Sequence, residues 1–428
     1  MASRRQSGRS LARAFIALLP AVFGLFTLSG CDDVYNVEIL YPLRKDWIIT
    51  AEKFDFNPPN FNPPGLLPLD VLDGRGGLEA FAPNLQKAAK DGLIIDPKTL
   101  NDTEKRDLMI ALRDLAGRPR NPKIDINDPA YDELNGKLQT ELHLDRKTLT
   151  EGSKLFRKNC LHCHGLTGDG RGPTGKWLNP PPRDYRQGAF KFTSSSQSEG
   201  ERKPRREDLR RVITNGVDGT SMPSFHLLKA EEIDALISYV IHLSIRGEAE
   251  METVKAIIRE KAQPAEEGAT PPKIYERVRT AAGVAANRWL AAQAAEIKPA
   301  NIREYKNDAE RLAAAKRGYE FFMRADQCSQ CHTNVGRDAE VRYDAWGTVV
   351  KPRNFFLNVF RGGRRPIDLY WRIHSGIKGS GMPPMVANPA ELKDKEGTIW
   401  DLIAFLQIVP YPEERAKLRA APYNVTLD

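Results

Sequence analysis

Four of the five cysteines of the chain occur in two short motifs of the same spacing. The first motif is Cys160-Leu-His-Cys163-His164, and the second is Cys328-Ser-Gln-Cys331-His332. Two thiols at this spacing can form thioether bonds to the two vinyl groups of one porphyrin, and the adjacent imidazole can then coordinate the iron. The pattern therefore predicts two covalently attached haem c groups, with His164 and His332 as the proximal iron ligands.

Two other kinds of site also use closely spaced cysteines. A thioredoxin-like redox pair is expected within a β-α-β pattern, which the sequence around the motifs lacks. A zinc site needs two more ligands at regular spacing, but the one remaining cysteine, Cys31, is far upstream. A single motif would leave both alternatives open, whereas the repetition of the pattern favours haem.

A glycine-rich loop downstream of each motif contains methionine followed by proline. Met222 and Met382 occupy equivalent positions, because residues 208–223 and 368–383 match at a constant offset of 160 residues. A methionine in such a loop is rarely a core residue. We therefore expect each thioether to be the second axial ligand, which raises the reduction potential and leaves no open site on the iron.

Other side chains compete for the same role. Met385 is an alternative to Met382 in the second copy, although the repeat favours Met382. His226 and His242 could compete for the first haem, and His374 aligns with a threonine of the first copy. We interpret these three histidines as ordinary polar residues.

Helices are expected on both sides of each motif. Apolar residues and glycine lie on one helical face before each motif: Leu149, Gly152, Leu155 and Phe156, and Leu312, Ala315, Tyr319 and Phe322. An apolar helix-like stretch closes each copy, at residues 235–240 and 401–406. Gly152 and Gly318 destabilise a helix, so we expect them to allow close approach of the closing helix of the same copy.

The order of these elements resembles the class I cytochrome c fold, in the variety related to small oxidase-associated c-type subunits. The resemblance includes the Gly168–Pro173 segment and the Pro-Arg loops at Arg183 and Arg353. It covers roughly residues 146–246 and 308–412. The resemblance implies that Arg183 and Arg353 hydrogen-bond haem propionates. The alternative is that they are surface arginines after a proline turn.

The N-terminus has the pattern of a secretory leader. Residues 1–13 are basic, residues 14–28 are apolar, and Leu28-Ser-Gly-Cys31 follows, which resembles the bacterial lipobox. This predicts a lipoprotein signal peptide at residues 1–30, and a lipidated Cys31 that holds the protein on the periplasmic side of a bacterial membrane. An uncleaved anchor helix is the alternative, but the apolar run is short for a membrane span.

The remaining segments complete a mainly α architecture of two class I cytochrome c domains in tandem. The predicted parts are the signal peptide (1–30), a Pro- and aromatic-rich strap with a helical segment (31–145), domain 1 (146–246), a helical connector (247–307), domain 2 (308–412) and a C-terminal tail (413–428). We expect a helix at residues 104–115. Residues 32–75 are interpreted as a packed strap rather than a free linker, because their aromatic side chains are unfavourable in water.

The expected function is single-electron transfer between redox proteins, such as a respiratory complex, an oxidase or a dehydrogenase. No acid–base constellation is found, so no catalytic residue and no small-molecule substrate are predicted. The net charge of +8 lies partly in the leader and gives no reason to expect a nucleic-acid partner. The alternatives are a dihaem peroxidase-like enzyme with one open haem site, and a permanent electron-relay subunit of a larger complex.

Overall fold

The computed structural model describes residues 38–46, 48–49, 94–198, 202–262, 272–343 and 349–427. The chain forms two units, residues 1–40 and 41–428, and the fold below is that of the second unit. The predicted signal peptide, Cys31 and most of the predicted strap lie outside the described residues. Within the described ranges, every helix is too short or too polar to cross a membrane.

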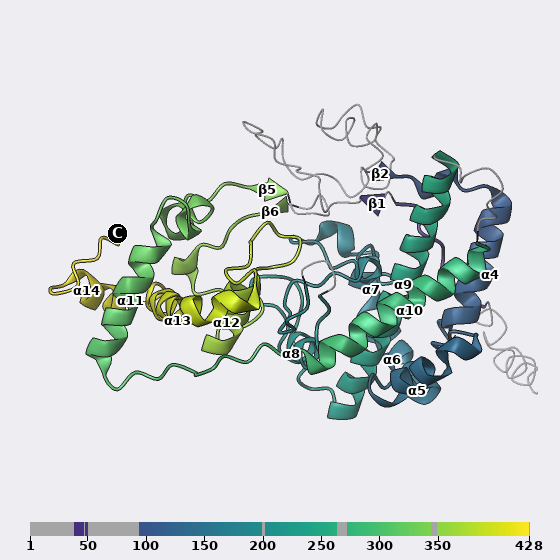
Figure 1. Ribbon diagram of the computed structural model, residues 1–428, viewed down its shortest axis with the longest axis horizontal. Coiled ribbons are helices and arrows are strands. Elements are labelled where there is room, and N and C mark those ends of the chain that lie inside the picture. The colour runs from purple at the N-terminus through teal and green to yellow at the C-terminus, as the bar shows by residue number, and fades with distance from the viewer. Residues whose placement is uncertain are drawn as a thin grey trace, which may run out of the picture. The chain divides into compact units, whose positions relative to one another are not determined.

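The second unit is mainly helical, as predicted (Figure 1). Its α-helices are α4 (Asp102–Ala116), α5 (Asp132–Thr140), α6 (Arg146–Asn159), α7 (Leu161–His164), α8 (Arg206–Asn215), α9 (Ala230–Ala262), α10 (Ile274–Ala294), α11 (Asp308–Phe322), α12 (Pro366–Ser375), α13 (Leu392–Ile408) and α14 (Pro412–Arg419). Its short 3-10 helices are η3 (Pro97–Thr99), η4 (Pro129–Tyr131), η5 (Gly175–Trp177), η6 (Tyr185–Gln187), η7 (Cys328–Gln330), η8 (Thr333–Gly336), η9 (Phe355–Leu357) and η10 (Pro389–Glu391).

The strands are two residues long and form antiparallel pairs. These pairs are β1 (Ile48–Ile49) with β2 (Ile94–Ile95), β3 (Gly117–Arg118) with β4 (Asn121–Pro122), and β5 (Arg342–Tyr343) with β6 (Val349–Val350).

Several helices begin at a residue whose side chain accepts a hydrogen bond from an unpaired backbone N–H group of the first turn. Asn101 caps α4 and forms a reciprocal pair of hydrogen bonds with Glu104. Asp145 caps α6, and Asn307 caps α11. The helix predicted at residues 104–115 is confirmed by α4, and those expected before the two Cys motifs are confirmed by α6 and α11.

Each repeat is held together by a close crossing of its first and last helices. In the first repeat α6 packs on α9, and in the second α11 packs on α13. A Cβ atom at Gly152 would lie 2.1 Å from the backbone oxygen of Ala235, and one at Gly318 would lie 2.1 Å from that of Asp401. The expected use of these glycines, which is to let the closing helix approach, is therefore confirmed.

Helix α9 continues to Ala262, well past residue 246, where the sequence analysis ends the first domain. Residues 246–250 of this helix are buried although three of them are charged. Lys203 Nζ lies 2.6 Å from Glu248 Oε2, and Arg246 Nη1 lies 3.0 Å from Glu250 Oε2. Because these charges are paired, the helix can remain inside the protein.

The first repeat shares its hydrophobic core with segments outside the predicted domain. Helices α4 and α10 both pack against α9, and Figure 1 shows α10 crossing α9 at an angle. The core extends from Leu108 of α4 to Trp289 of α10, both fully buried. The helical part of the predicted connector is therefore packed onto the first repeat.

A short N-terminal segment also packs on α9. The hydroxyls of Tyr41 and Tyr239 share a hydrogen bond of 2.7 Å, and Arg44 N donates to Glu250 Oε1 at 2.6 Å. Asp46 is buried between Arg44 and Arg186. This part of the predicted strap, residues 41–46, is therefore packed.

The first repeat has a polar insertion near residues 193–204 that the second repeat lacks, and its described residues connect different parts of the unit. Ile297 N donates to Ser194 O at 2.8 Å, and Ser196 N donates to Ala295 O at 2.7 Å. Arg202 Nη1 donates to Ser375 O, in the second repeat, at 2.6 Å. The second repeat has two hydrophobic clusters of its own, centred on α11 with α13 and on α12 with α13.

Candidate functional site

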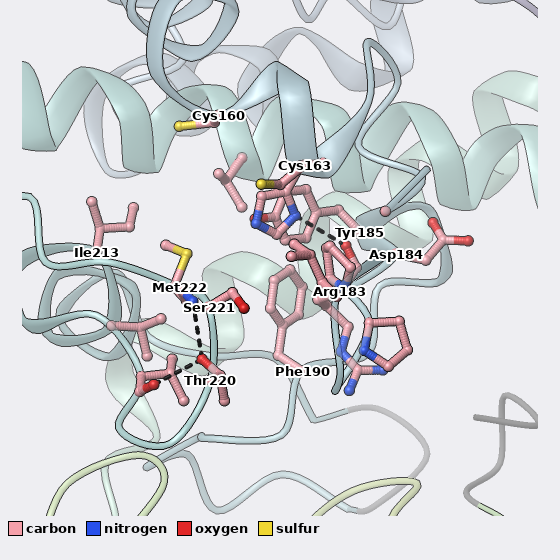
Figure 2. A pocket seen from close by; sticks show the side chains of 18 of the residues that line it. Cys160, Cys163, Arg183, Asp184, Tyr185, Phe190, Ile213, Thr220, Ser221 and Met222 are labelled. Atoms are coloured by element: carbon pink, nitrogen blue, oxygen red, sulfur yellow. Dashed lines mark hydrogen bonds between the residues drawn. The ribbon is translucent and has the colours of Figure 1, made fainter. Parts of the chain in front are cut away.

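A cavity of about 330 Å³ lies beside the first Cys motif. Cys160, Cys163 and His164 line it from the α6–α7 segment, and Met222 lines it from the loop after α8. Figure 2 shows both cysteines on one side of this space and Met222 on the other. The walls are largely apolar, as is typical of cofactor sites. The structure thus brings together the predicted attachment cysteines and both predicted axial ligands.

His164 is held in an orientation that suits metal binding. Its Nδ1 lies 3.3 Å from the carbonyl oxygen of Arg183, which can accept a hydrogen bond from the tautomer protonated at Nδ1. Burial lowers the pKa of His164 to about 4, so the ring is neutral near pH 7. A metal-binding histidine commonly donates one ring nitrogen in this way, which leaves the other nitrogen for the metal.

The other nitrogen of His164 already has a neighbour. The Tyr185 hydroxyl lies 3.2 Å from Nε2, and the two rings stack with centroids 4.8 Å apart. Iron ligation by Nε2 therefore requires this hydroxyl to move aside. Phe355, at the equivalent position of the second repeat, has no hydroxyl.

The second repeat reproduces this arrangement. His332 Nδ1 lies 3.1 Å from the carbonyl oxygen of Arg353, and Phe355 packs on the His332 ring with centroids 4.8 Å apart. Burial lowers the pKa of His332 as well. The two histidines therefore have the same backbone acceptor, one from each Pro-Arg loop.

The two methionine loops share the same backbone hydrogen bond. Val217 N donates to Met222 O at 3.1 Å, and Ile377 N donates to Met382 O at the same distance. Each loop also has a glycine in the left-handed region, Gly216 with φ +72° and Gly376 with φ +66°, where a side chain would meet the loop backbone.

The cysteines are free in both motifs and partly buried. Burial raises the pKa of Cys160 to about 12 and that of Cys328 to about 11. A thioredoxin-like pair depends on a thiol whose pKa is lowered. The environment of these cysteines therefore disfavours the dithiol alternative.

The competing side chains have other bonding partners. The fully buried His242 bonds through Nε2 to Ala116 O at 2.9 Å. His226 bonds to Ser224, and His374 bonds to Ser375. Met385 belongs to the hydrophobic clusters of the second repeat. In the described ranges, no three His, Cys, Asp or Glu side chains gather as a metal-ion site.

The two arginines predicted to bind propionates occupy similar places. Their carbonyls accept from His164 and His332, and the side chain of Arg183 lines the first cavity. Figure 2 shows Arg183 at the edge of this space. Arg353 reaches the Met222 loop of the first repeat, where its guanidinium lies 3.8 Å from the Cβ position of Gly219.

The sequence analysis missed the aromatic side chains that support the histidines. Phe190 stacks on Tyr185 at 5.8 Å, and Phe360 lies 6.0 Å from Phe355. These pairs occupy matching positions in the two Pro-Arg loops. The signal in the sequence that marks them is this aromatic repetition, since both pairs have the same five-residue spacing.

In comparison with known proteins, part of the first repeat is similar to a family of c-type cytochrome subunits. Residues 147–240 match the family described as cytochrome c oxidase, cbb3-type, subunit III. No curated protein matches the chain. A chain of the reducing HAO-like protein complex of Kuenenia stuttgartiensis is similar at 22% identity and a TM-score of 0.42, over 60% of this chain and 95% of that chain.

Proposed function

We propose that the protein is a dihaem c-type cytochrome that passes single electrons between redox partners. The observation that carries this proposal is the repeated geometry. Each Cys-x-x-Cys-His segment has a histidine oriented by the carbonyl of its Pro-Arg loop, and each is followed by the same backbone-bonded methionine loop. One such site lies in a segment that matches a cytochrome c family.

The side chains present fit a covalent haem at each site. The attachment residues are Cys160 and Cys163 in the first repeat, and Cys328 and Cys331 in the second. A bound haem would supply a one-electron iron couple at each site. His164 and His332 would hold the iron from one face, in the neutral form that their burial favours.

Met222 and Met382 would hold the iron from the opposite face. A thioether ligand on both irons leaves no position for a substrate, so the role is electron transfer rather than bond-making. The methionine side of each site is the proposed docking surface for a redox protein.

We further propose that Cys31 is lipidated and fixes the protein at the periplasmic side of a bacterial membrane. The support is the basic and apolar leader ending in Leu28-Ser-Gly-Cys31. A tethered cytochrome meets a membrane-bound oxidase or dehydrogenase at a high effective concentration. The partner is therefore expected within the same membrane.

The haem count tests the first part of the proposal. Mass spectrometry of peptides containing residues 160–164 and 328–332 is expected to find one haem on each. Replacing both cysteines of either motif by alanine is expected to halve the haem content per chain. A wild-type protein with one haem or none would overturn the dihaem proposal.

Carbon monoxide tests the second part. Both haems of the reduced wild-type protein are expected to be low-spin and unreactive toward carbon monoxide in a spectroelectrochemical titration. If either iron binds carbon monoxide, its methionine is not a ligand, and the peroxidase-like alternative with an open site is favoured instead.

A further inference from the structure

The two repeats contact one another beside the Met222 loop. Gly219, with φ +68°, faces Val359 so closely that a Cβ atom would lie 2.6 Å from Val359 Cγ1. Arg361 Nη2 donates to Gly219 O at 3.3 Å. A Cβ atom at Gly362 would lie 2.4 Å from the ring of Phe192. A loop of the second repeat therefore packs against the methionine loop of the first repeat.

Arg361 lines the first cavity although it belongs to the second repeat. Lys191 also lines this cavity, and it follows Phe190 as Arg361 follows Phe360. The first cavity is therefore lined both by Lys191, from its own repeat, and by Arg361, which is the equivalent residue of the other repeat.

The charge of Arg361 is not balanced by a carboxylate. Burial lowers its pKa, and the nearby guanidinium of Arg353 lowers it further. Among the residues that the structure describes, no carboxylate acts on either arginine. The buried Nε of Arg361 has no hydrogen-bond acceptor.

Neighbouring arginines of the same loop have partners. Arg365 Nη2 lies 2.8 Å from Asp368 Oδ1, and Arg364 bonds to the Tyr411 hydroxyl. A half-buried cation without a counter-ion is unfavourable unless a ligand supplies the negative charge. Arginine is well suited to bind a carboxylate, since its donors match both oxygens.

We propose that Arg361 binds a propionate carboxylate of the haem held in the first cavity, so that the second repeat completes the haem site of the first. This inference rests on the proposed function. The positive charge of Arg361 would then favour the reduced form of the first haem, because reduction removes one positive charge from the nearby iron centre.

The test compares midpoint potentials of the holoprotein and its Arg361→Gln variant. The two haems are distinguished in a Met382→His background, where only the first haem keeps a methionine-to-iron charge-transfer band. Arg361→Gln is expected to lower the potential of the first haem by an amount equivalent to about tenfold in the equilibrium constant for reduction, or about 59 mV for one electron. The potential of the second haem is expected to change less.

Two further variants separate the effect of charge from that of packing. Arg361→Lys keeps the charge and is expected to restore most of the lost potential. Arg364→Gln removes an exposed cation of the same loop and is expected to leave the first haem unchanged. Equal shifts in the Gln and Lys variants at position 361 would contradict the proposal, even if both variants bind haem normally.

The remaining outcomes are also decisive. If Arg361→Gln shifts only the second haem, Arg361 serves its own repeat and the inference is wrong. If neither potential moves, Arg361 binds no propionate. Absence of covalent haem on residues 160–164 of the wild-type protein would instead defeat the proposed function itself, and mass spectrometry detects that separately.

Discussion

The Nδ1 atoms of His164 and His332 are hydrogen-bonded to a backbone carbonyl and not to an acidic side chain. In each repeat this carbonyl belongs to the arginine of the Pro-Arg loop. A carboxylate in this position would place more negative charge on the imidazole and lower the reduction potential of a bound iron. The neutral acceptor agrees with the proposed role of an electron carrier with methionine-ligated, high-potential haems.

Replacing Met222 by alanine is expected to open one coordination position on the first haem only. The reduced Met222→Ala protein should bind one carbon monoxide per chain, and its first haem should become high-spin when oxidised. Met382→Ala is the matched variant for the second haem. Absorption spectra of both variants, with and without carbon monoxide, check this, and an unchanged Met222→Ala spectrum would rule out Met222 as a ligand.

His242 is expected to make stability depend on pH. Burial lowers its pKa to about 4 from the usual 6.5, so protonation favours the unfolded chain. The free energy of unfolding is therefore unaffected by the titration of His242 above pH 6.5. It decreases as the pH falls from 6.5 toward 4, by about 3 kcal/mol in total.

Urea unfolding of wild-type and His242→Gln protein between pH 4 and 7.5 measures this effect. A glutamine amide can still donate to Ala116 O but does not titrate. The variant should therefore lose less stability on acidification than the wild type. Parallel pH curves for the two proteins would show that His242 does not titrate in this range.

At the scale of single elements, the two helix crossings tolerate no side chain at their glycines. Gly318→Ala places a methyl group 2.1 Å from the backbone oxygen of Asp401, so α11 and α13 must separate. We expect a loss of about 3 kcal/mol in the free energy of unfolding, measured by urea denaturation.

Gly397→Ala is the control for this substitution. Gly397 lies in α13, and its Cβ position has no neighbour within 4 Å. Alanine there should stabilise the protein by about 0.5–1 kcal/mol because of its helix propensity. If both substitutions stabilise the protein, the crossing is not as close as the structure has it.

The helices that flank the motifs could be predicted from the sequence because each buries one periodic face. Helix α11 begins and ends close to the predicted pattern of Leu312, Ala315, Tyr319 and Phe322. The second half of α9 belongs to the predicted helical connector, but its burial could not be predicted in the same way, because Glu248 is polar by type. Glu248 is buried against Lys203, which lies 45 residues away in sequence and balances its charge.

At the scale of the whole molecule, the ligand candidates follow from the sequence, but the neighbours of each site do not. The repeated motifs indicate which residues lie in each site. They contain no information on which loop of one repeat touches the other repeat, because the contact of Arg361 with Gly219 depends on how the repeats pack. The same holds for α10: Val278, Trp289 and several alanines form one buried face, but this pattern does not indicate that the face packs on α9.

Asp46 is expected to fix the N-terminal segment to the first repeat. It lies among Arg44, Arg171 and Arg186, which hold the pKa of its carboxyl well below the usual range despite burial. Asp46→Asn leaves buried guanidinium groups without this counter-charge and should reduce stability by about 3 kcal/mol or more.

Urea denaturation, together with protease sensitivity of residues 41–46, measures this effect. Asp125→Asn is the control, since Asp125 forms an exposed pair with Lys123 and should change stability by less than about 0.5 kcal/mol. Equal stability of the two variants would show that the buried cluster does not hold the segment.

The contacts of residues 41–46 also determine when the first repeat can finish folding. Tyr41 meets Tyr239 across 198 residues, and Arg44 meets Glu250 across 206. Within the second repeat, the bond between Arg317 of α11 and Asp401 of α13 spans only 84 residues. Contacts of long sequence separation form late, since a large loop must close first. During synthesis, residues 41–46 therefore wait for most of α9 to appear, and they are among the last parts of the first repeat's core to be packed.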